Sequence, residues 1–319
     1  MKGFQLLLLL PFLLADRGGA QAQTGPARPV TLQKAAAASA AAQIEKGRAE
    51  SREWLRSDPQ SYLAAIDRVD FGESASLTVG SAADNQVRLG AEGIEPHDLR
   101  ISVDGDRFRV QALDAAARFR IKDEVKREAT VGPSAIQVGR FTLRLSHQRF
   151  PAIVVFDPRS PRLKSYKGID YFPIDLSYRY ELPLIRDSQP EKIVIVSTRG
   201  NRRSAERVGW VSFWVGKTAC RLEVTRLLEP GVGENDLSIF FCDLTNGKET
   251  YPLGRYVDLR KLDNGNYLLD FNQAYSPACA FSDYYNCPIP PKSNRLGVAI
   301  RAGEKDSHYS HQGPGVSHQ

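Results

Sequence analysis

Polar side chains that could recognise a ligand are concentrated towards the C-terminal end of the 319-residue chain. Asp270 and Asn272 are two residues apart, so their side chains would share one face if a strand continued through them. Arg255, placed between carboxylates, could form paired hydrogen bonds with them. The sequence predicts a pocket for a small polar ligand, with these candidate ligand-binding residues: Glu249, Tyr251, Arg255, Asp270, Asn272, Tyr275, Asn294, Arg295 and Glu304.

The same residues also have a structural interpretation. The segment 272–298 contains Pro277, Pro288, Pro290 and Pro291, which suit an ordered path outside a sheet. Such a segment carries many backbone polar groups that need hydrogen-bond partners. A buried network of side chains could therefore hold it on the sheet as a clasp, and the sequence leaves both interpretations open.

The alternative function is a carboxylate-based hydrolase that acts on a polar, glycan-like substrate. Asp270 with Glu249 or Glu304 could supply the acid and the base, which requires the two carboxyl groups to lie within about 10 Å in an open cleft. Carboxylates near Asn272 could also hold Ca²⁺. The chain has neither a Gly-x-Ser-x-Gly motif nor a phosphate-binding glycine loop, so the sequence identifies no catalytic residue.

The chain contains four cysteines, an even number that would suit a protein outside the cytoplasm. Cys279 and Cys287 are the candidate disulfide. Cys220 and Cys242 lie in strand-like stretches and could bridge neighbouring strands or stay buried as thiols. With only five histidines and no short cysteine spacing, we expect neither a metal site nor a cofactor.

Residues 1–22 have the pattern of a secretory signal peptide. Lys2 precedes an apolar run that is too short for a permanent membrane span, and Ala20-Gln21-Ala22 suits a cleavage site. We expect a periplasmic or secreted protein that is not an integral membrane protein after cleavage, with an uncleaved anchor as the rival. The net charge of +6 is too small to indicate nucleic acid. The expected partner is therefore an unknown small polar ligand or an envelope protein, bound through an exposed edge strand.

Hydrophobic periodicity predicts a helix over 33–55, a shorter one ending at Ile66, and strands from Ser76 onward. Asp104-Gly105, Asn246-Gly247 and Asn264-Gly265 are hairpin signals. The basic stretch from Arg199 to Arg207 reads as a solvated hairpin loop. The main expected strands cover residues 77–79, 99–103, 107–110, 119–121, 135–138, 141–145, 152–156, 210–215, 221–225, 237–242, 256–259, 267–271 and 296–300.

The first β region carries a familiar order of short motifs at residues 79–81, 84–89, 97 and 138–143. The pattern resembles a forkhead-associated domain, an eleven-stranded sandwich that binds phosphothreonine through its loops. The resemblance implies an arginine where this chain has Ser81 and a serine where it has Ile94. Those side chains would bind the phosphate. We therefore do not expect phosphothreonine binding, and we expect His97 to brace the loops.

Residues 245–256 and 269–305, with support from Asn85 and residues 168–175, resemble the signature of the bacterial domain of unknown function 1684 family. The resemblance implies a domain plan and no reaction. The expected fold is mainly β: a forkhead-associated-like β-sandwich, then a second antiparallel β domain, after a short N-terminal helical lead. The predicted domains are a signal peptide (1–22), a spacer and helical lead (23–66), the sandwich (67–157), the second β domain with its proline-rich clasp (158–305) and a disordered tail (306–319).

Overall fold

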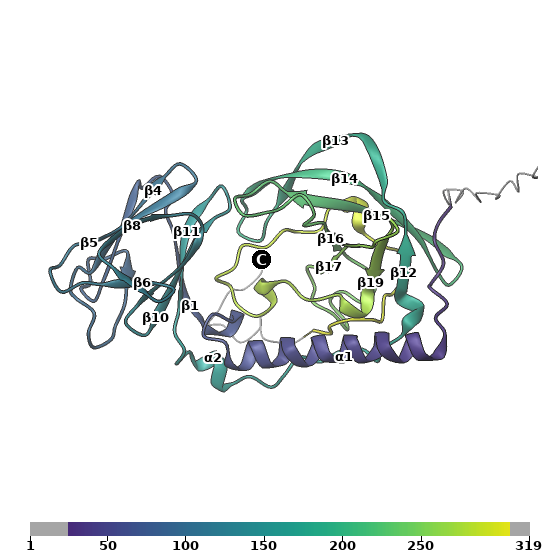
Figure 1. Ribbon diagram of the computed structural model, residues 1–319, viewed down its shortest axis with the longest axis horizontal. Coiled ribbons are helices and arrows are strands. Elements are labelled where there is room, and N and C mark those ends of the chain that lie inside the picture. Colours follow the sequence, from purple (N-terminus) through teal and green to yellow (C-terminus); the bar gives the residue numbers. More distant parts are fainter. Residues whose placement is uncertain (1–24, 307–319) are drawn as a thin grey trace, which may run out of the picture.

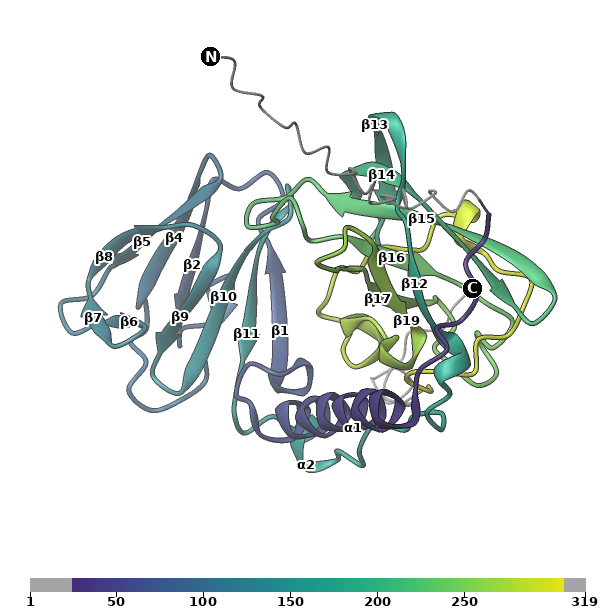
Figure 2. The same cartoon turned by 45° about the vertical axis from the view of Figure 1, so that its right-hand side comes forward.

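The computed structural model describes residues 25–306, and its architecture is mainly β, as expected. The predicted signal peptide and residues 307–319 of the predicted tail lie outside the described residues. A sandwich and a second β region lie side by side, and helix α1 (Lys34–Ser57) runs along one side of the second region (Figure 1, Figure 2). No helix in residues 25–306 is long and apolar enough to cross a membrane.

The sandwich consists of eleven strands in two sheets, with the orders β1-β11-β10-β9-β6-β7 and β3-β2-β4-β5-β8. Alternate residues of each strand point between the sheets, where Val79, Ile101, Phe108 and Leu143 are fully buried. The strands are β1 (Ala65–Asp70), β2 (Ser76–Gly80), β3 (Val87–Arg88), β4 (Leu99–Asp104), β5 (Arg107–Ala112), β6 (Phe119–Ile121), β7 (Glu124–Lys126), β8 (Glu128–Val131), β9 (Ser134–Val138), β10 (Phe141–His147) and β11 (Pro151–Phe156).

The hairpin turn predicted at Asp104-Gly105 is confirmed, and the sandwich has a second hairpin with a similar turn. Strands β4 and β5 pair from Asp104 opposite Arg107, across a turn in which Gly105 has φ +57°. Strands β9 and β10 pair from Val138 opposite Phe141, and Gly139 has φ +55°. Glycine adopts this left-handed conformation at no steric cost, so these two turns are specified locally.

The second β region has a five-stranded sheet, β13-β14-β15-β16-β17, and a three-stranded sheet, β12-β19-β18. Phe271 lies in the core between them, where its ring contacts Tyr180, Phe213 and Phe241. The Asn264-Gly265 turn joins β18 to β19, as its hairpin signal predicts. The strands are β12 (Arg179–Leu182), β13 (Ile185–Val196), β14 (Arg202–Val215), β15 (Thr218–Leu227), β16 (Ser238–Phe241), β17 (Arg255–Asp258), β18 (Arg260–Lys261) and β19 (Tyr267–Asp270).

Residues 271–306, here called the clasp, follow β19 and contain no extended strand. The strand expected over 296–300 is not formed. Instead the clasp makes isolated contacts with the sheets, such as the mutual backbone hydrogen bonds of Tyr256 and Tyr275 at 2.9 Å. Its regular structure is limited to short 3₁₀ turns at Phe271–Gln273, Ala278–Ala280 and Lys292–Asn294.

The helical lead docks along much of its length, because Ala40, Ile44, Arg48 and Leu55 of α1 are all buried. The shorter helix expected up to Ile66 is wrong: a 3₁₀ turn at Tyr62–Ala64 leads directly into β1. Two short helical segments occur later, α2 (Pro161–Lys164) and a 3₁₀ turn at Leu176–Tyr178.

Side chains pack across the seam between the sandwich and the clasp. Ala65, Val154 and Phe156 on β1 and β11 form a buried cluster against which Tyr284 and Tyr285 of the clasp pack. The outer face of this sandwich sheet is therefore partly covered by the second β region, which matters for the site described next.

Candidate functional site

Arg255 is the most deeply buried polar residue of the predicted set. It is 0% exposed, and its guanidinium lies 2.8 Å from a carboxylate oxygen of Asp243. It also donates hydrogen bonds to the backbone carbonyls of Ile300, Ala302 and Glu304. A guanidinium whose two Nη groups are engaged in this way holds the end of the clasp in place and offers little to a ligand, although its Nε–H has no partner among the described residues.

Asp270, Asn272 and Asn294 also hold the clasp. Asp270 forms an ion pair with Arg179 and accepts a hydrogen bond from the Asn272 backbone N–H at 3.1 Å. This bond starts a 3₁₀ turn, so the strand does not continue to Asn272 as predicted. The Asn272 side chain bonds to both the N–H and the C=O of Asp175 at 2.9 Å. The buried Asn294 side chain bonds to Glu223 and Phe240 of β15 and β16 in the same way.

Three other members of the set are separated from one another. Glu249 forms a surface ion pair with Arg301 at 2.9 Å. The Tyr251 hydroxyl lies 3.6 Å from Cys279 Sγ, inside a buried cluster. Arg295 is exposed and contacts Cys242 only through its backbone. The nine predicted residues therefore do not converge on one pocket, and only Tyr275 and Glu304 reach the hollows described below.

The predicted disulfide is absent from the described residues. Cys279 and Cys287 are both buried free thiols, and the Cys279 backbone N–H lies 3.3 Å from Cys287 Sγ. Cys220 and Cys242 are also buried free thiols, which agrees with the second of their two predicted states. Compact packing of the clasp brings the first two cysteines together without a covalent bond.

The sandwich loops that carry Ser81, Asn85, Ile94 and His97 are held together by hydrogen bonds of their own side chains and backbone. Ser81 Oγ donates a hydrogen bond to the Ile94 carbonyl at 3.1 Å. The side chain that braces these loops is Asn85, whose amide donates to the carbonyls of Ala82 and Pro96. His97 is half exposed and lies 3.7 Å from Asp84. The bracing role predicted for His97 therefore belongs to Asn85.

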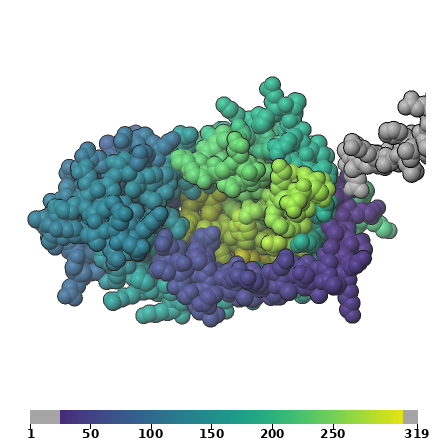
Figure 3. Space-filling model, in the orientation of Figure 1, coloured from purple at the N-terminus to yellow at the C-terminus, as the bar shows by residue number. Residues whose placement is uncertain are grey.

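A pocket of about 310 Å³, here called the seam pocket, opens between the sandwich and the second β region. Both regions supply its walls: strand residues come from β1, β10 and β11, and clasp residues lie opposite. In Figure 3 the yellow clasp lies recessed between the blue sandwich, the green strands and the purple helix. The lining residues are Tyr62, Arg68, Arg144, Ser146, Gln148, Val154, Arg203, Tyr256, Tyr275, Pro277, Ala278, Tyr285, Asn286, Cys287 and Pro288.

Three arginines reach the seam pocket, and two of them form ion pairs with carboxylates. Arg68 pairs with Asp70 at 2.7 Å, and Arg203 pairs with Glu229 through two bonds at 2.5 and 2.7 Å. Arg203 is only 3% exposed, so the prediction of a solvated loop is wrong at that position. Arg144 forms no ion pair with any residue in 25–306. It therefore supplies a positive charge without a protein counter-ion.

Arg144 is held in place by weak contacts and faces two phenols. Its guanidinium lies 4.7 Å from the centre of the Phe156 ring and donates to the Gln60 carbonyl at 3.4 Å. Burial raises the pKa of Tyr62 to about 12 and raises that of Tyr285, while the charge of Arg144 opposes both increases. Both phenols are neutral near pH 7. The buried hydroxyl of Tyr285 finds no hydrogen-bond partner among the described residues.

A second, smaller pocket of about 170 Å³, here called the inner pocket, adjoins the seam pocket. Tyr62 and Tyr275 line both. Glu304 lies in its wall and accepts a hydrogen bond from the Ser276 backbone N–H at 2.8 Å. Burial raises the pKa of Glu304 to about 7, although this hydrogen bond and the charge of Arg255 oppose the rise. The inner pocket is lined by Ser51, Trp54, Leu55, Tyr62, Ile169, Tyr275, Ser276, Phe281 and Glu304.

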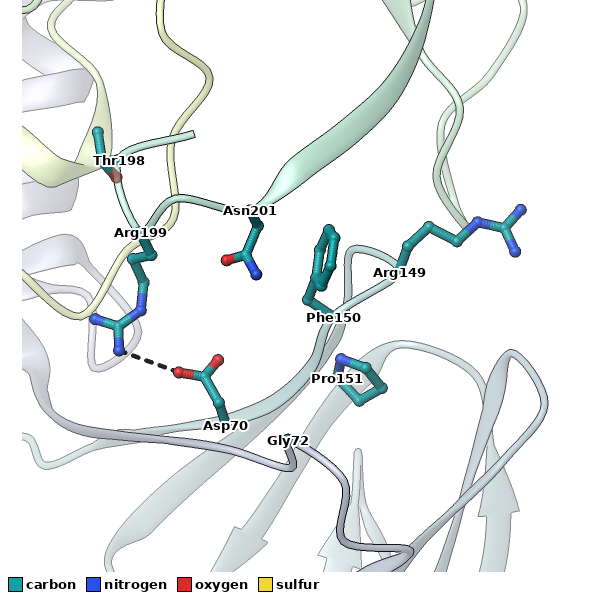
Figure 4. A pocket seen from close by; sticks show the side chains of 8 residues that line it. All are labelled: Asp70, Gly72, Arg149, Phe150, Pro151, Thr198, Arg199 and Asn201. Carbon is teal, nitrogen blue, oxygen red and sulfur yellow. Dashed lines mark hydrogen bonds and ion pairs between the residues drawn. The ribbon is translucent and has the colours of Figure 1, made fainter. Parts of the chain in front are cut away.

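A larger hollow of about 490 Å³ lies at the edge of the seam (Figure 4). Arg199 and Asp70 pair across it at 3.1 Å. The Arg149 guanidinium points away from the other lining side chains in Figure 4, and it lies 3.4 Å from Asp106. Each of its two arginines is thus held in an ion pair, although Asp70 also pairs with Arg68. The seam pocket is the better candidate despite its smaller volume, because Arg144 has no ion-pair partner within residues 25–306.

Residues 25–306 form no site for calcium or another metal ion. No group of three or more His, Cys, Asp or Glu side chains in residues 25–306 is placed to hold a metal ion. The carboxylate considered for Ca²⁺, that of Asp270, is occupied by Arg179 and by Asn272.

Residues 164–305 match a family described as protein of unknown function (DUF1684). The chain belongs to this family. The match covers the second β region and the whole clasp up to Lys305, and so includes the clasp side of the seam pocket. No curated protein matches the chain.

Several solved structures are similar to parts of this DUF1684 protein. A solution NMR structure of an uncharacterized protein from Haloarcula marismortui is 35% identical, covering 47% of this chain and 82% of that one, with a TM-score of 0.37. The FhaA FHA domain is 21% identical over 25% of this chain and 79% of its own, with a TM-score of 0.20. An FHA domain studied for its phosphothreonine-dependent interactions is 18% identical over 29% of this chain and 95% of its own, with a TM-score of 0.21.

Sequence reasoning missed the residues that make the seam pocket charged and aromatic. Arg144 lies between the buried residues Leu143 and Leu145 on β10. The alternation of apolar and polar residues along this strand therefore predicts that the Arg144 side chain points outward into solvent. Tyr62 and Tyr285 lie in irregular segments with no periodic signal. Only the packing of the clasp on the sandwich brings these three side chains together.

Proposed function

We propose that this protein is an extracytoplasmic binding module whose seam pocket holds a small ligand with an anionic group. The observation that carries the proposal is Arg144, a half-buried guanidinium without a carboxylate partner in residues 25–306. Arginine presents a planar set of donors that suits carboxylates and phosphates. The extracytoplasmic location rests on the signal-peptide pattern of residues 1–22.

The rest of the pocket supports a ligand that is polar and compact. The phenols of Tyr62 and Tyr285 present ring faces as well as hydroxyl donors, and Ser146, Gln148 and Asn286 add further polar groups. Pockets that combine aromatic walls with a few placed polar groups are typical of small-molecule sites. An acidic sugar is a ligand of this chemistry, which agrees with the glycan-like ligand considered from the sequence.

The test is calorimetric titration with glucuronate and with glucose as its neutral parent. We expect glucuronate to bind more tightly, because a charged hydrogen bond contributes about 1.5–3 kcal/mol. Arg144→Gln should weaken glucuronate binding at least about tenfold. Arg100→Gln is the matched control, since Arg100 is an exposed strand arginine on the other sheet of the sandwich. Equal binding by the wild type and Arg144→Gln would contradict the proposal.

The hydrolase alternative has weaker support. Its carboxyl pairs require Asp270 and Glu249 to be available, but the first is paired with Arg179 and the second with Arg301. Glu304 alone lies in a pocket wall. The arrangement therefore favours binding over hydrolysis.

An envelope protein partner is a second candidate, and edge strand β13 favours it. Ile185, Val194 and Val196 on this strand are 44%, 53% and 43% exposed. An exposed apolar edge strand can pair with another chain. Val194→Lys should abolish capture of such a partner in an extracellular or periplasmic cross-linking experiment and leave glucuronate binding unchanged. Undiminished cross-linking by this variant would rule out β13 as the contact.

A further inference from the structure

Four aromatic rings surround the inner pocket. Trp54 comes from α1, Tyr62 from the turn before β1, and Tyr275 and Phe281 from the clasp. The rings of Trp54 and Tyr62 lie nearly perpendicular, with centroids 4.8 Å apart, and Tyr62 lies 5.6 Å from Phe281. Aromatic faces attract cations, and several rings around one hollow are the arrangement that recognises alkylammonium groups.

The inner pocket also contains a carboxylate that has no cationic partner in the described structure. Glu304 is 6% exposed and forms no ion pair within residues 25–306. The contacts of Arg255 with this residue are made to its backbone carbonyl. Its carboxylate accepts hydrogen bonds from neutral groups, including the Ser276 N–H and, at 3.4 Å, the Tyr171 hydroxyl.

A buried hydroxyl lies next to this carboxylate. Ser276 is 2% exposed, and its side chain, like its backbone N–H, favours the charged form of Glu304 by hydrogen bonding. The inner pocket therefore has a carboxylate and a neighbouring hydroxyl in a largely aromatic wall, a composition suited to an organic cation. A hard metal ion would require more oxygen ligands.

The two pockets adjoin each other. Tyr62 and Tyr275 line both. The Glu304 carboxylate raises the pKa of Tyr62 and the Arg144 guanidinium lowers it, so both charges act on this one ring. A positive and a negative group of the protein thus lie near the residues that the two pockets share.

We infer that the inner pocket is an aromatic cage for an ammonium group, so that the ligand is a zwitterion with its anionic group at Arg144 and its ammonium at Glu304. This inference rests on the proposed function, because it assigns the anionic end of the ligand to the seam pocket. The inner pocket volume of about 170 Å³ leaves room for a trimethylammonium group. The chemical class is therefore a small phosphate or carboxylate that carries an alkylated ammonium.

The test compares ligands of the same shape that differ in charge. Phosphocholine and 3,3-dimethylbutyl phosphate have the same shape, but only the first carries a positive charge. Calorimetric titration of the full chain should show at least about tenfold tighter binding of phosphocholine. Glycine betaine serves as the carboxylate counterpart. Equal binding of phosphocholine and 3,3-dimethylbutyl phosphate, with no binding of glycine betaine, would overturn the inference without any variant.

Two variants test whether Glu304 and Arg144 are responsible for the binding of phosphocholine. Glu304→Gln should remove the preference for phosphocholine over 3,3-dimethylbutyl phosphate, whereas Arg144→Gln should weaken both ligands. Asp98→Asn is the control, since Asp98 is a buried carboxylate of the sandwich outside both pockets. A preference that survives in Glu304→Gln would overturn the cage.

The outcomes also separate this inference from the proposed function. If 3,3-dimethylbutyl phosphate binds through Arg144 and phosphocholine binds no more tightly, the anion site is supported and the cage is ruled out. If choline binds in a Glu304-dependent way while no anion binds, the proposed function fails and the zwitterionic ligand fails with it. Co-flotation with phosphatidylcholine vesicles, compared with free phosphocholine, determines whether a lipid headgroup or a free molecule is the source.

Discussion

The sandwich and the second β region provide hydrogen-bond partners for their buried backbone groups in different ways. The sandwich buries a mainly apolar core with a few polar residues, such as Asn85, Asp98 and His147, and its strands satisfy one another's backbone groups in regular ladders. The second β region buries Arg255, Asp243, Asp270 and Glu304 as well as its apolar residues. The clasp explains the difference, because a chain segment without strands needs side-chain partners for its backbone groups.

The comparison shows that a density of buried polar residues is a poor guide to a binding site. Arg255, Asn272 and Asn294 are occupied by the clasp itself. Two groups near the junction of the regions lack an oppositely charged partner within residues 25–306: the Arg144 guanidinium from the sandwich and the Glu304 carboxylate from the clasp. A site at this junction depends on both regions at once.

The sharpest test of this contrast is Arg255→Ala. Removing the guanidinium leaves the Asp243 carboxylate buried without its ion pair, and three carbonyls lose their donor. We expect a loss of about 3–5 kcal/mol of stability, measured by urea denaturation, or failure to fold. Arg109→Ala, in the exposed pair with Glu128 of the sandwich, should lose less than about 1 kcal/mol. Similar losses for both variants would remove the distinction.

The pH dependence of stability provides the next largest effect. The folded-state pKa of Glu304 is raised to about 7, so its proton is bound more tightly in the folded than in the unfolded chain. Its contribution to stability is therefore full below about pH 4.5 and is lost as pH rises through 7. Between pH 4.5 and 8 the wild type should lose about 3 kcal/mol more than Glu304→Gln.

The sandwich offers its own control for this measurement. Burial raises the pKa of Asp98 to about 6, helped by Glu95 and Asp114. Asp98→Asn should therefore change the pH profile mainly below pH 6, and Glu304→Gln mainly around pH 7. The groups that face Glu304 are Ser276, Tyr171, Tyr275 and Arg255, and none of these titrates in that range. Parallel profiles for wild type and Glu304→Gln above pH 6 would show that Glu304 is not buried as described.

Replacing one asparagine in each region compares how strongly side-chain hydrogen bonds stabilise the clasp and the sandwich loops. Asn294 makes three backbone hydrogen bonds in the clasp, and Asn85 makes two in the sandwich. Replacement by alanine should cost about 2–3 kcal/mol at Asn294 and about 1–2 kcal/mol at Asn85, as measured by urea denaturation. A larger loss at Asn85 would indicate that the sandwich depends on side-chain bracing more than the clasp does.

The smallest effect is expected at Glu249, the one predicted ligand residue in a surface ion pair. Because both partners are partly or largely exposed to solvent, water screens their attraction. Glu249→Gln should shift the melting temperature by less than about 1 °C. A large shift in a differential scanning experiment would place Glu249 in the clasp network.

The amino-acid sequence by itself determined the local features of this protein. Alternating apolar residues specified the strands, Gly105 and Gly265 marked hairpin turns, and the Ala-rich lead formed a helix. The clasp motif also identified the family. These features depend on short-range periodicity and backbone preference, which the order of residues expresses directly.

The tertiary structure decided which polar groups are free. In sequence, Arg144 is an outward residue of an exposed strand, and Asp270 is as plausible a ligand as Glu304. Packing of the clasp over the outer face of β10 and β11 turned Arg144 towards a pocket, while Arg179 neutralised Asp270. Contacts between residues far apart in the chain decide burial and charge pairing, and no local pattern records them.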